Sequence, residues 1–179
     1  VWVKHLKMEV SPMVYTYLVQ VVIYNNNGRI RGISEQTAVS SVARGVSLHT
    51  GQTSEDDAVV CFDMRMKQNR KARQGKDADI LGGKMTTFGL CGMQPWVASR
   101  ADHVYNGTRT DLNNEMLLNL RFHNELEKSF TYDVTPQMRR QAHGGVITIE
   151  IDADTITVPL KPGSSPGAGF DPVINGYDD

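Results

Sequence analysis

The stretch "VYTYLVQVVIY", residues 14–24, decides the fold class of this chain. Every second position carries a large apolar side chain, namely Tyr15, Tyr17, Val19, Val21 and Ile23. A period of two predicts a β-strand that buries one face and exposes the other.

The same alternation returns in four later segments, which are "LLNLRFH" (117–123), "SFTYDV" (129–134), "VITIEID" (146–152) and "TITVPL" (155–160). Polar turns separate such runs, and Ala153-Asp154 is expected to join the last two as a hairpin. One helix is expected near 135–142, with Thr135 as N-cap, Pro136 in the first turn and Gly144 at the end. The pattern predicts an all-β, immunoglobulin-like antiparallel sandwich with one short helix.

The composition fits one domain followed by a tail. The 179 residues are expected to form a single sandwich over 1–160, and 161–179 read as a Gly/Pro-rich acidic tail. The 19 basic residues nearly balance the 20 acidic ones, so the net charge indicates no nucleic-acid partner. The basic stretch 65–76 lacks aromatic residues for base stacking and is interpreted as a solvated hairpin loop.

Motifs for catalysis fail on their context. "GGKMT" (82–86) lacks the spacing of a phosphate-binding loop, and "GSSPG" (163–167) lies in the tail instead of a strand-to-helix turn. The five histidines have no metal-ligand spacing to each other or to a cysteine. We therefore expect no enzyme activity, no cofactor and no metal site.

The two cysteines, Cys61 and Cys91, leave two alternatives open. A disulfide between them would close a loop of about 30 residues and stabilise the fold by roughly 3–4 kcal/mol. It would also indicate an oxidising compartment. The other reading is two free, buried thiols.

Exposed aromatic residues suggest an alternative function. Trp96 and Tyr105 lie in segments expected to be loops, where aromatic rings could contact sugars. That arrangement is typical of a glycan-binding module of a surface lipoprotein. Packing of both rings within the loops is the plainer interpretation.

Several pieces together resemble the lipid-anchored minor fimbrial proteins of Bacteroidales, which are related to the fimbrillins. The matching pieces are "PMVYTYLVQVVI" (12–23), "SSVARGVSLHTGQ" (40–52), "VVCF" (59–62), "TTFGLC" (86–91), "FTYDVTPQM" (130–138) and "GAGFDP" (167–172). They stand in the family's order, and the family's two cysteines stand where Cys61 and Cys91 stand.

The resemblance implies a transthyretin-like β-sandwich, exported through the periplasm to the cell surface and the outer membrane. It implies that the chain corresponds to the second domain of a longer lipoprotein whose lipid anchor lies upstream. Its expected partners are the fimbrial shaft or other fimbrial subunits, joined by addition of a β-strand to an open sheet edge. In the tail, Phe170, Val173 and Ile174 are the candidates for such a partner strand.

Overall fold

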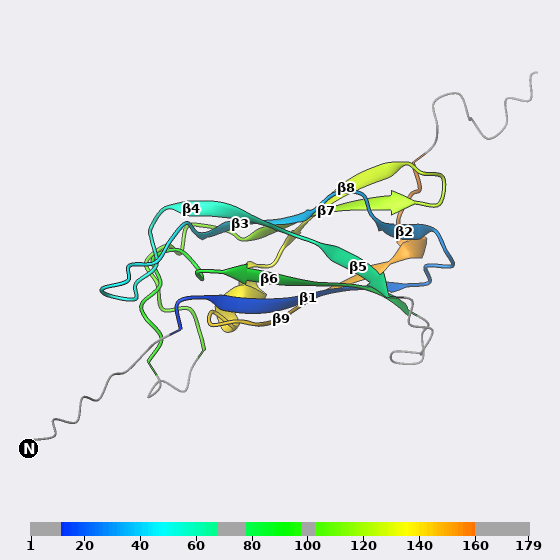
Figure 1. Ribbon diagram of the computed structural model, residues 1–179. Helices are drawn as coiled ribbons and strands as arrows, with labels where there is room; N and C mark the ends of the chain where they lie inside the picture. The colour runs from blue at the N-terminus through cyan, green and yellow to red at the C-terminus, as the bar shows by residue number, and fades with distance from the viewer. Residues whose placement is uncertain (1–11, 68–77, 98–102, 160–179) are drawn as a thin grey trace, which may run out of the picture.

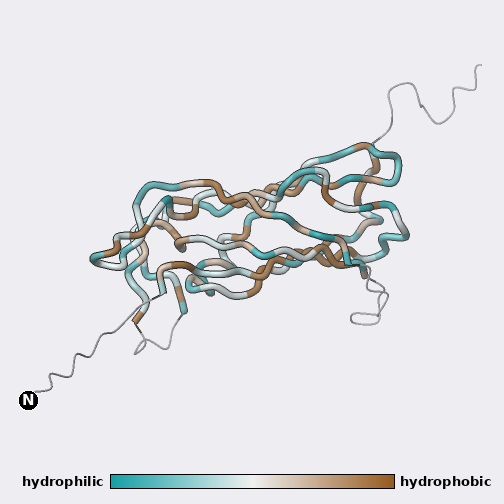
Figure 2. Tube along the Cα trace, viewed as in Figure 1, coloured by the Kyte–Doolittle hydropathy of each residue, from teal (hydrophilic) through white to brown (hydrophobic). Residues whose placement is uncertain are grey.

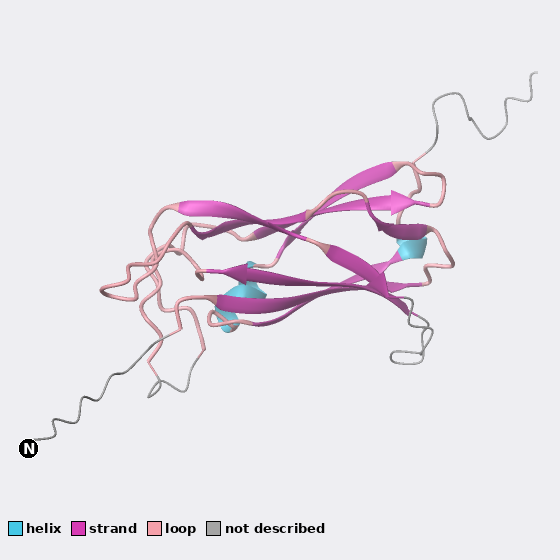
Figure 3. Ribbon diagram, viewed as in Figure 1, coloured by secondary structure: helices cyan, strands magenta, loops and turns pink. Residues whose placement is uncertain are grey.

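The computed structural model describes residues 12–67, 78–97 and 103–159. These residues form two β-sheets packed face to face, with one short α-helix at one flank (Figure 1). The predicted all-β sandwich is confirmed. Figure 3 shows how little of the described chain is helical.

Nine strands build the two sheets in the described part of the chain, and β1, β7, β8 and β9 follow the period-two runs of the sequence. The nine strands are β1 (Tyr15–Tyr24), β2 (Ile30–Ile33), β3 (Thr37–Ala43), β4 (Asp57–Phe62), β5 (Met64–Lys67), β6 (Ala78–Thr87), β7 (Glu115–Phe122), β8 (Glu127–Asp133) and β9 (Gly145–Asp152). The helix α1 spans Thr135–Arg140, and a single 3-10 turn, η1, spans Ala153–Thr155.

The first sheet has the order β5-β6-β1-β9, with β1 at its centre. β1 pairs antiparallel with β6 along its whole length, from Tyr15 opposite Thr87 to Tyr24 opposite Ala78. Its other edge pairs with β9 in parallel. The sandwich is therefore not purely antiparallel. The chain enters β9 from β8 of the other sheet, through the segment that contains α1.

In the second sheet, β7 is the central strand. One edge of β7 pairs with β8 in unbroken antiparallel register. The other edge is shared, because β2 pairs with residues 120–122 and β3 pairs with residues 116–117. β4 continues the sheet beyond β3.

One flank is closed by the chain itself. β4 pairs with β3 in one sheet, and after Asp63 the chain continues as β5, which pairs with β6 in the other sheet. The strand pair β4–β5 thus joins the two sheets. Since β4 and β5 lie on this flank, β8 and β9 lie on the opposite one.

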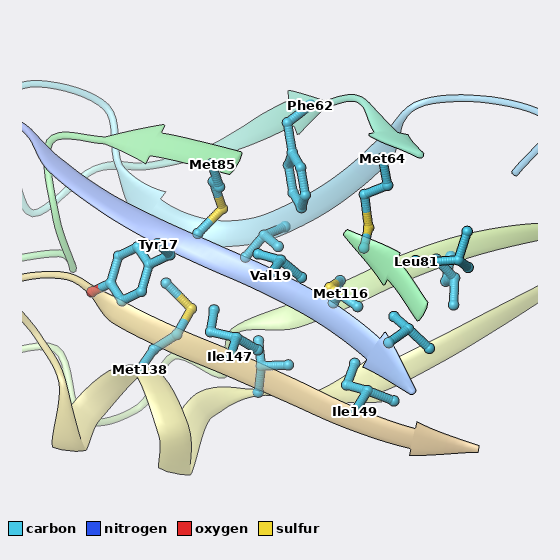
Figure 4. Packing of buried hydrophobic residues seen from close by; sticks show 14 of the residues in the cluster. Tyr17, Val19, Phe62, Met64, Leu81, Met85, Met116, Met138, Ile147 and Ile149 are labelled. Atoms are coloured by element: carbon cyan, nitrogen blue, oxygen red, sulfur yellow. The ribbon is translucent and has the colours of Figure 1, made fainter. Parts of the chain in front are cut away.

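The core forms between the sheets from the apolar faces that the alternation predicts. Tyr17, Val19 and Val21 of β1 are at most 2% exposed and belong to the core cluster. Figure 4 shows Tyr17 and Val19 among side chains of both sheets. Met138 brings the helix into the same core. In contrast to the core, the turn between β7 and β8 is hydrophilic (Figure 2).

Two local predictions differ from the structure. The residue that caps α1 is Val134, and Thr135 is already helical, with its N–H bonded to the Asp133 carboxylate at 2.9 Å. The segment 155–160 was expected to be a strand after a hairpin. Instead the Asp152 carboxylate accepts from Asp154 N–H and starts η1, and Ile156 then packs against the core without joining a sheet.

Candidate functional site

The free edge of β8 is the feature of this fold best suited to bind a partner. Two hydrogen bonds fix which backbone groups face β7: Phe122 N–H donates to Leu126 O at 2.9 Å, and Val134 N–H donates to Asn114 O at 2.9 Å. Even-numbered residues of β8 therefore bond to β7. The N–H and C=O groups of Ser129 and Thr131 consequently point away from the sheet.

No strand among the described residues pairs with this outer edge of β8. Ser129 and Thr131 are exposed, and the Ser129 hydroxyl is turned to the outer face of the sheet, where it donates to Asn119 Oδ1 at 2.6 Å. Unpaired backbone groups on an exposed strand form a template for another strand. A partner strand would meet no side chain across the edge at these two residues.

The core-facing side of β8 carries half-buried aromatic residues. The rings of Phe130 and Tyr132 stack with centroids 6.5 Å apart, and Lys128 Nζ lies 5.4 Å from the Phe130 centroid. Partial burial raises the pKa of the Tyr132 phenol, so this side chain stays neutral at physiological pH. An added strand with alternating apolar residues would extend this aromatic surface.

The other edge of the second sheet, β4, is a poorer template. The register of β3 and β4 shifts between Val39 and Val42, and Ser41 has a positive φ of 59°. Such a bulge twists an edge. The chain also leaves this sheet after Phe62 to enter β5, so an added strand would find fewer aligned residues than at β8.

The predicted disulfide is absent, because Cys61 and Cys91 are free. Cys91 is buried beside Asp56, whose backbone oxygen lies 3.8 Å from Cys91 Sγ. Cys61 lies five residues further along the chain, on exposed β4. At about 3.3 Å per residue, Cys61 lies about 16 Å along β4 from Asp56, the residue beside Cys91, so a disulfide between the two cysteines does not form.

The environment of Cys91 does not favour reactivity. Burial, with Asp57 nearby, raises its pKa to about 11, so the thiol is protonated at neutral pH. It borders a small hollow that is also lined by Tyr105, Arg109 and Arg139. The two arginines are engaged, Arg109 with Asp111 at 2.9 Å and Arg139 with the backbone oxygens of residues 110 and 112.

The two aromatic candidates for glycan contact are both half-buried. Tyr105 O–H donates to Cys91 O at 2.6 Å and accepts from Arg109 N–H at 2.9 Å, while the Arg139 guanidinium lies over its ring. Trp96 packs against the core cluster. The two rings therefore do not form an exposed surface on which a sugar could stack.

Other predicted features lie partly or wholly outside the described residues. Phe170, Val173 and Ile174 fall in 160–179, and most of the basic stretch falls in 68–77. Within the described ranges no cluster of three or more metal-ligating side chains occurs. The described part of the chain also contains no helix long and apolar enough to cross a membrane.

Comparisons with known proteins give fold neighbours only. No protein family matches the sequence, and no curated protein matches it. The fold is similar to that of a "putative adhesin" from Bacteroides ovatus, with 13% identity and a TM-score of 0.43 over 88% of this chain and 56% of that chain. It is also similar to a "putative cell adhesion protein" from Bacteroides fragilis, with 11% identity and a TM-score of 0.45 over 79% of this chain and 42% of that chain. The chain thus spans about half the length of these two proteins.

Proposed function

We propose that this chain is a structural, non-enzymatic subunit of cell-surface fimbriae, which anchors or assembles them at the outer membrane by strand addition. The observation that carries the proposal is the open edge of β8, with the outward backbone groups of Ser129 and Thr131. The ordered sequence pieces that resemble the minor fimbrial proteins of Bacteroidales supply the biological setting. An upstream lipid anchor would attach the subunit to the membrane.

The chemistry of β8 indicates the kind of strand that would bind. Backbone hydrogen bonds would give the affinity, and side chains at alternate positions would give the specificity. Apolar residues on one face would extend the surface of Phe130 and Tyr132, while polar residues would lie beside Thr131. A tail segment such as Phe170 to Ile174 of a neighbouring subunit has this mixed character.

A single substitution tests the edge. Thr131→Pro removes the outward N–H and places a ring on the edge, yet it breaks no bond to β7, because Thr131 lies at a position that does not bond to that strand. Thr131→Ala keeps the N–H and is the matched control. Both variants are introduced into cells of the source organism that lack the gene, and the fraction of fimbriae that remains cell-bound is measured.

The expected result is shed or abnormally long fimbriae with Thr131→Pro and normal attachment with Thr131→Ala. Circular dichroism of the purified variants checks that both retain the sandwich. Normal attachment of fimbriae with a folded Thr131→Pro protein would contradict strand addition at β8. Normal fimbriae in cells without the gene would contradict the fimbrial role altogether, and glycan binding lost on Trp96→Ala would then be examined.

A further inference from the structure

The first half of the outer edge of β9 is covered by side chains instead of a strand. β9 uses one edge for its parallel pairing with β1. On its other edge, the backbone groups of Val146 and Thr148 point toward α1. The side chains that meet them belong to Gln137, in α1, and Gln141, which caps the C-terminal end of the helix.

Each glutamine makes a reciprocal pair of hydrogen bonds with one residue of β9. Gln137 Nε2 donates to Thr148 O at 2.9 Å, and Thr148 N–H donates to Gln137 Oε1 at 2.8 Å. Gln141 Nε2 donates to Val146 O at 3.0 Å, and Val146 N–H donates to Gln141 Oε1 at 2.8 Å. A carboxamide offers one donor group and one acceptor, as a peptide unit does, so each pair reproduces the pairing of an antiparallel strand.

The spacing of helix and strand explains why two glutamines fit. Residues four apart on a helix rise about 6 Å, and residues two apart on a strand rise about 6.6 Å. The order is also reversed, because Gln137 meets Thr148 and Gln141 meets Val146. The helix therefore presents its amides to β9 as an antiparallel neighbour would.

The helix is held in place by the core and by the start of β9. Met138 is fully buried between the sheets, and Tyr17 O–H donates to Ala142 O at 3.1 Å just beyond the helix. Gly145 leaves room for the amide of Gln141, since a Cβ at that position would overlap it. A helix of six residues has little stability of its own, so these contacts fix the two glutamines at the edge.

We propose that Gln137 and Gln141 form an amide latch that substitutes for an edge strand and closes β9 to pairing with a second copy of this chain. The latch leaves β8 as the long open edge on the same flank. Opening it would present the N–H and C=O groups of Val146 and Thr148 to the same edge of another molecule. This proposal does not depend on the proposed function, because it concerns β9 and not the edge of β8 that would bind a partner.

Amide hydrogen exchange, followed residue by residue by NMR, tests the latch. Gln137→Met and Gln141→Met keep the length and helix propensity of the side chain but cannot form the reciprocal pair. Gln137→Met should accelerate exchange of the Thr148 amide about fivefold or more and leave the Val146 amide near its original rate. Gln141→Met should do the reverse, on the basis of a net contribution of about 1 kcal/mol per hydrogen bond.

The control is Arg140→Met, on the same helix, whose guanidinium reaches only the Pro136 carbonyl oxygen among the described residues. It should change neither rate. Unchanged exchange of Thr148 in folded Gln137→Met, or equal acceleration of both amides in each single variant, would overturn the latch.

Sedimentation velocity tests whether the latch prevents self-association through β9. It is done in a Thr131→Pro background, where the edge of β8 cannot contribute to a dimer. Adding Gln137→Met and Gln141→Met together should produce a concentration-dependent dimer, while the background protein and its Arg140→Met derivative stay monomeric. A monomer at all concentrations, with the Val146 and Thr148 amides exchanging freely, would overturn the inference that the latch prevents self-association. Neither result depends on whether β8 binds a fimbrial partner.

Discussion

The two cysteines should differ sharply in their reaction with a thiol reagent such as a water-soluble aromatic disulfide. Cys61 is exposed on β4, whereas Cys91 is 2% exposed and its pKa is raised from 9.0 to about 11. The thiolate is the reacting species. Native protein without reductant should therefore show one fast thiol and one slow thiol.

The raised pKa of Cys91 by itself slows the reaction of this thiol. A rise of two units in the pKa lowers the thiolate fraction of Cys91 about a hundredfold at pH 7. The more basic thiolate is intrinsically about tenfold more nucleophilic, because the Brønsted coefficient is about 0.5. The net chemical effect is about a tenfold slower reaction. Burial adds to it, since the reagent must wait for the loop around Cys91 to open.

The assay follows release of the coloured thiol with time at pH 7 for wild-type protein and two variants. Cys91→Ala should keep the fast phase alone, and Cys61→Ser should keep the slow phase alone. Denaturant should merge the two phases at a total of two thiols per chain. No reactive thiol in denatured, unreduced protein would show a disulfide and refute the reasoning, and equal native rates would refute the burial of Cys91.

Three further changes probe stability, each read as the midpoint of urea unfolding. Met138→Ala empties a fully buried site under α1 and should cost about 2–5 kcal/mol. Gly144→Ala should cost about 1–3 kcal/mol, because φ is +94° and the new Cβ would lie 2.6 Å from Thr16 O. The hydrogen bond from Thr135 lowers the pKa of Asp133 below its ordinary 3.8. Its stabilisation is therefore present above that pH and lost as the pH falls below it, and Asp133→Asn should remove this acid dependence.

The sequence was informative about the strands because alternation acts locally. Tyr17, Val19 and Val21 share one face in any strand, whatever its neighbours are, so β1 and its burial could be predicted. The segment after Asp152 shows that alternation alone does not make a strand. Its alternation is as regular as that of β9, but a local carboxylate-to-backbone bond starts a 3-10 turn there instead of a hairpin.

The candidate sites were harder to predict because they depend on which strands become neighbours. A disulfide would need Cys61 and Cys91 to lie side by side. Cys91 instead lies beside Asp56, at the start of β4, and the pairing of β4 with β3 carries Cys61 to the other end of that strand. The spacing of Gln137 and Gln141 is visible in the sequence, yet it gains meaning only from the parallel placement of β9, which no local pattern encodes.

The difference between the two edges follows from the topology of one flank. β8 and β9 are consecutive strands but belong to different sheets, so the chain leaves β8, crosses to the other sheet through α1 and only then enters β9. That crossover necessarily passes beside the edge of β9 and can carry side chains that cover it. It passes β8 only at its end, where Asp133 is already bonded to Thr135. The same short segment therefore covers the first half of the outer edge of β9, whereas no strand among the described residues pairs with the outer edge of β8 from Glu127 to Thr131.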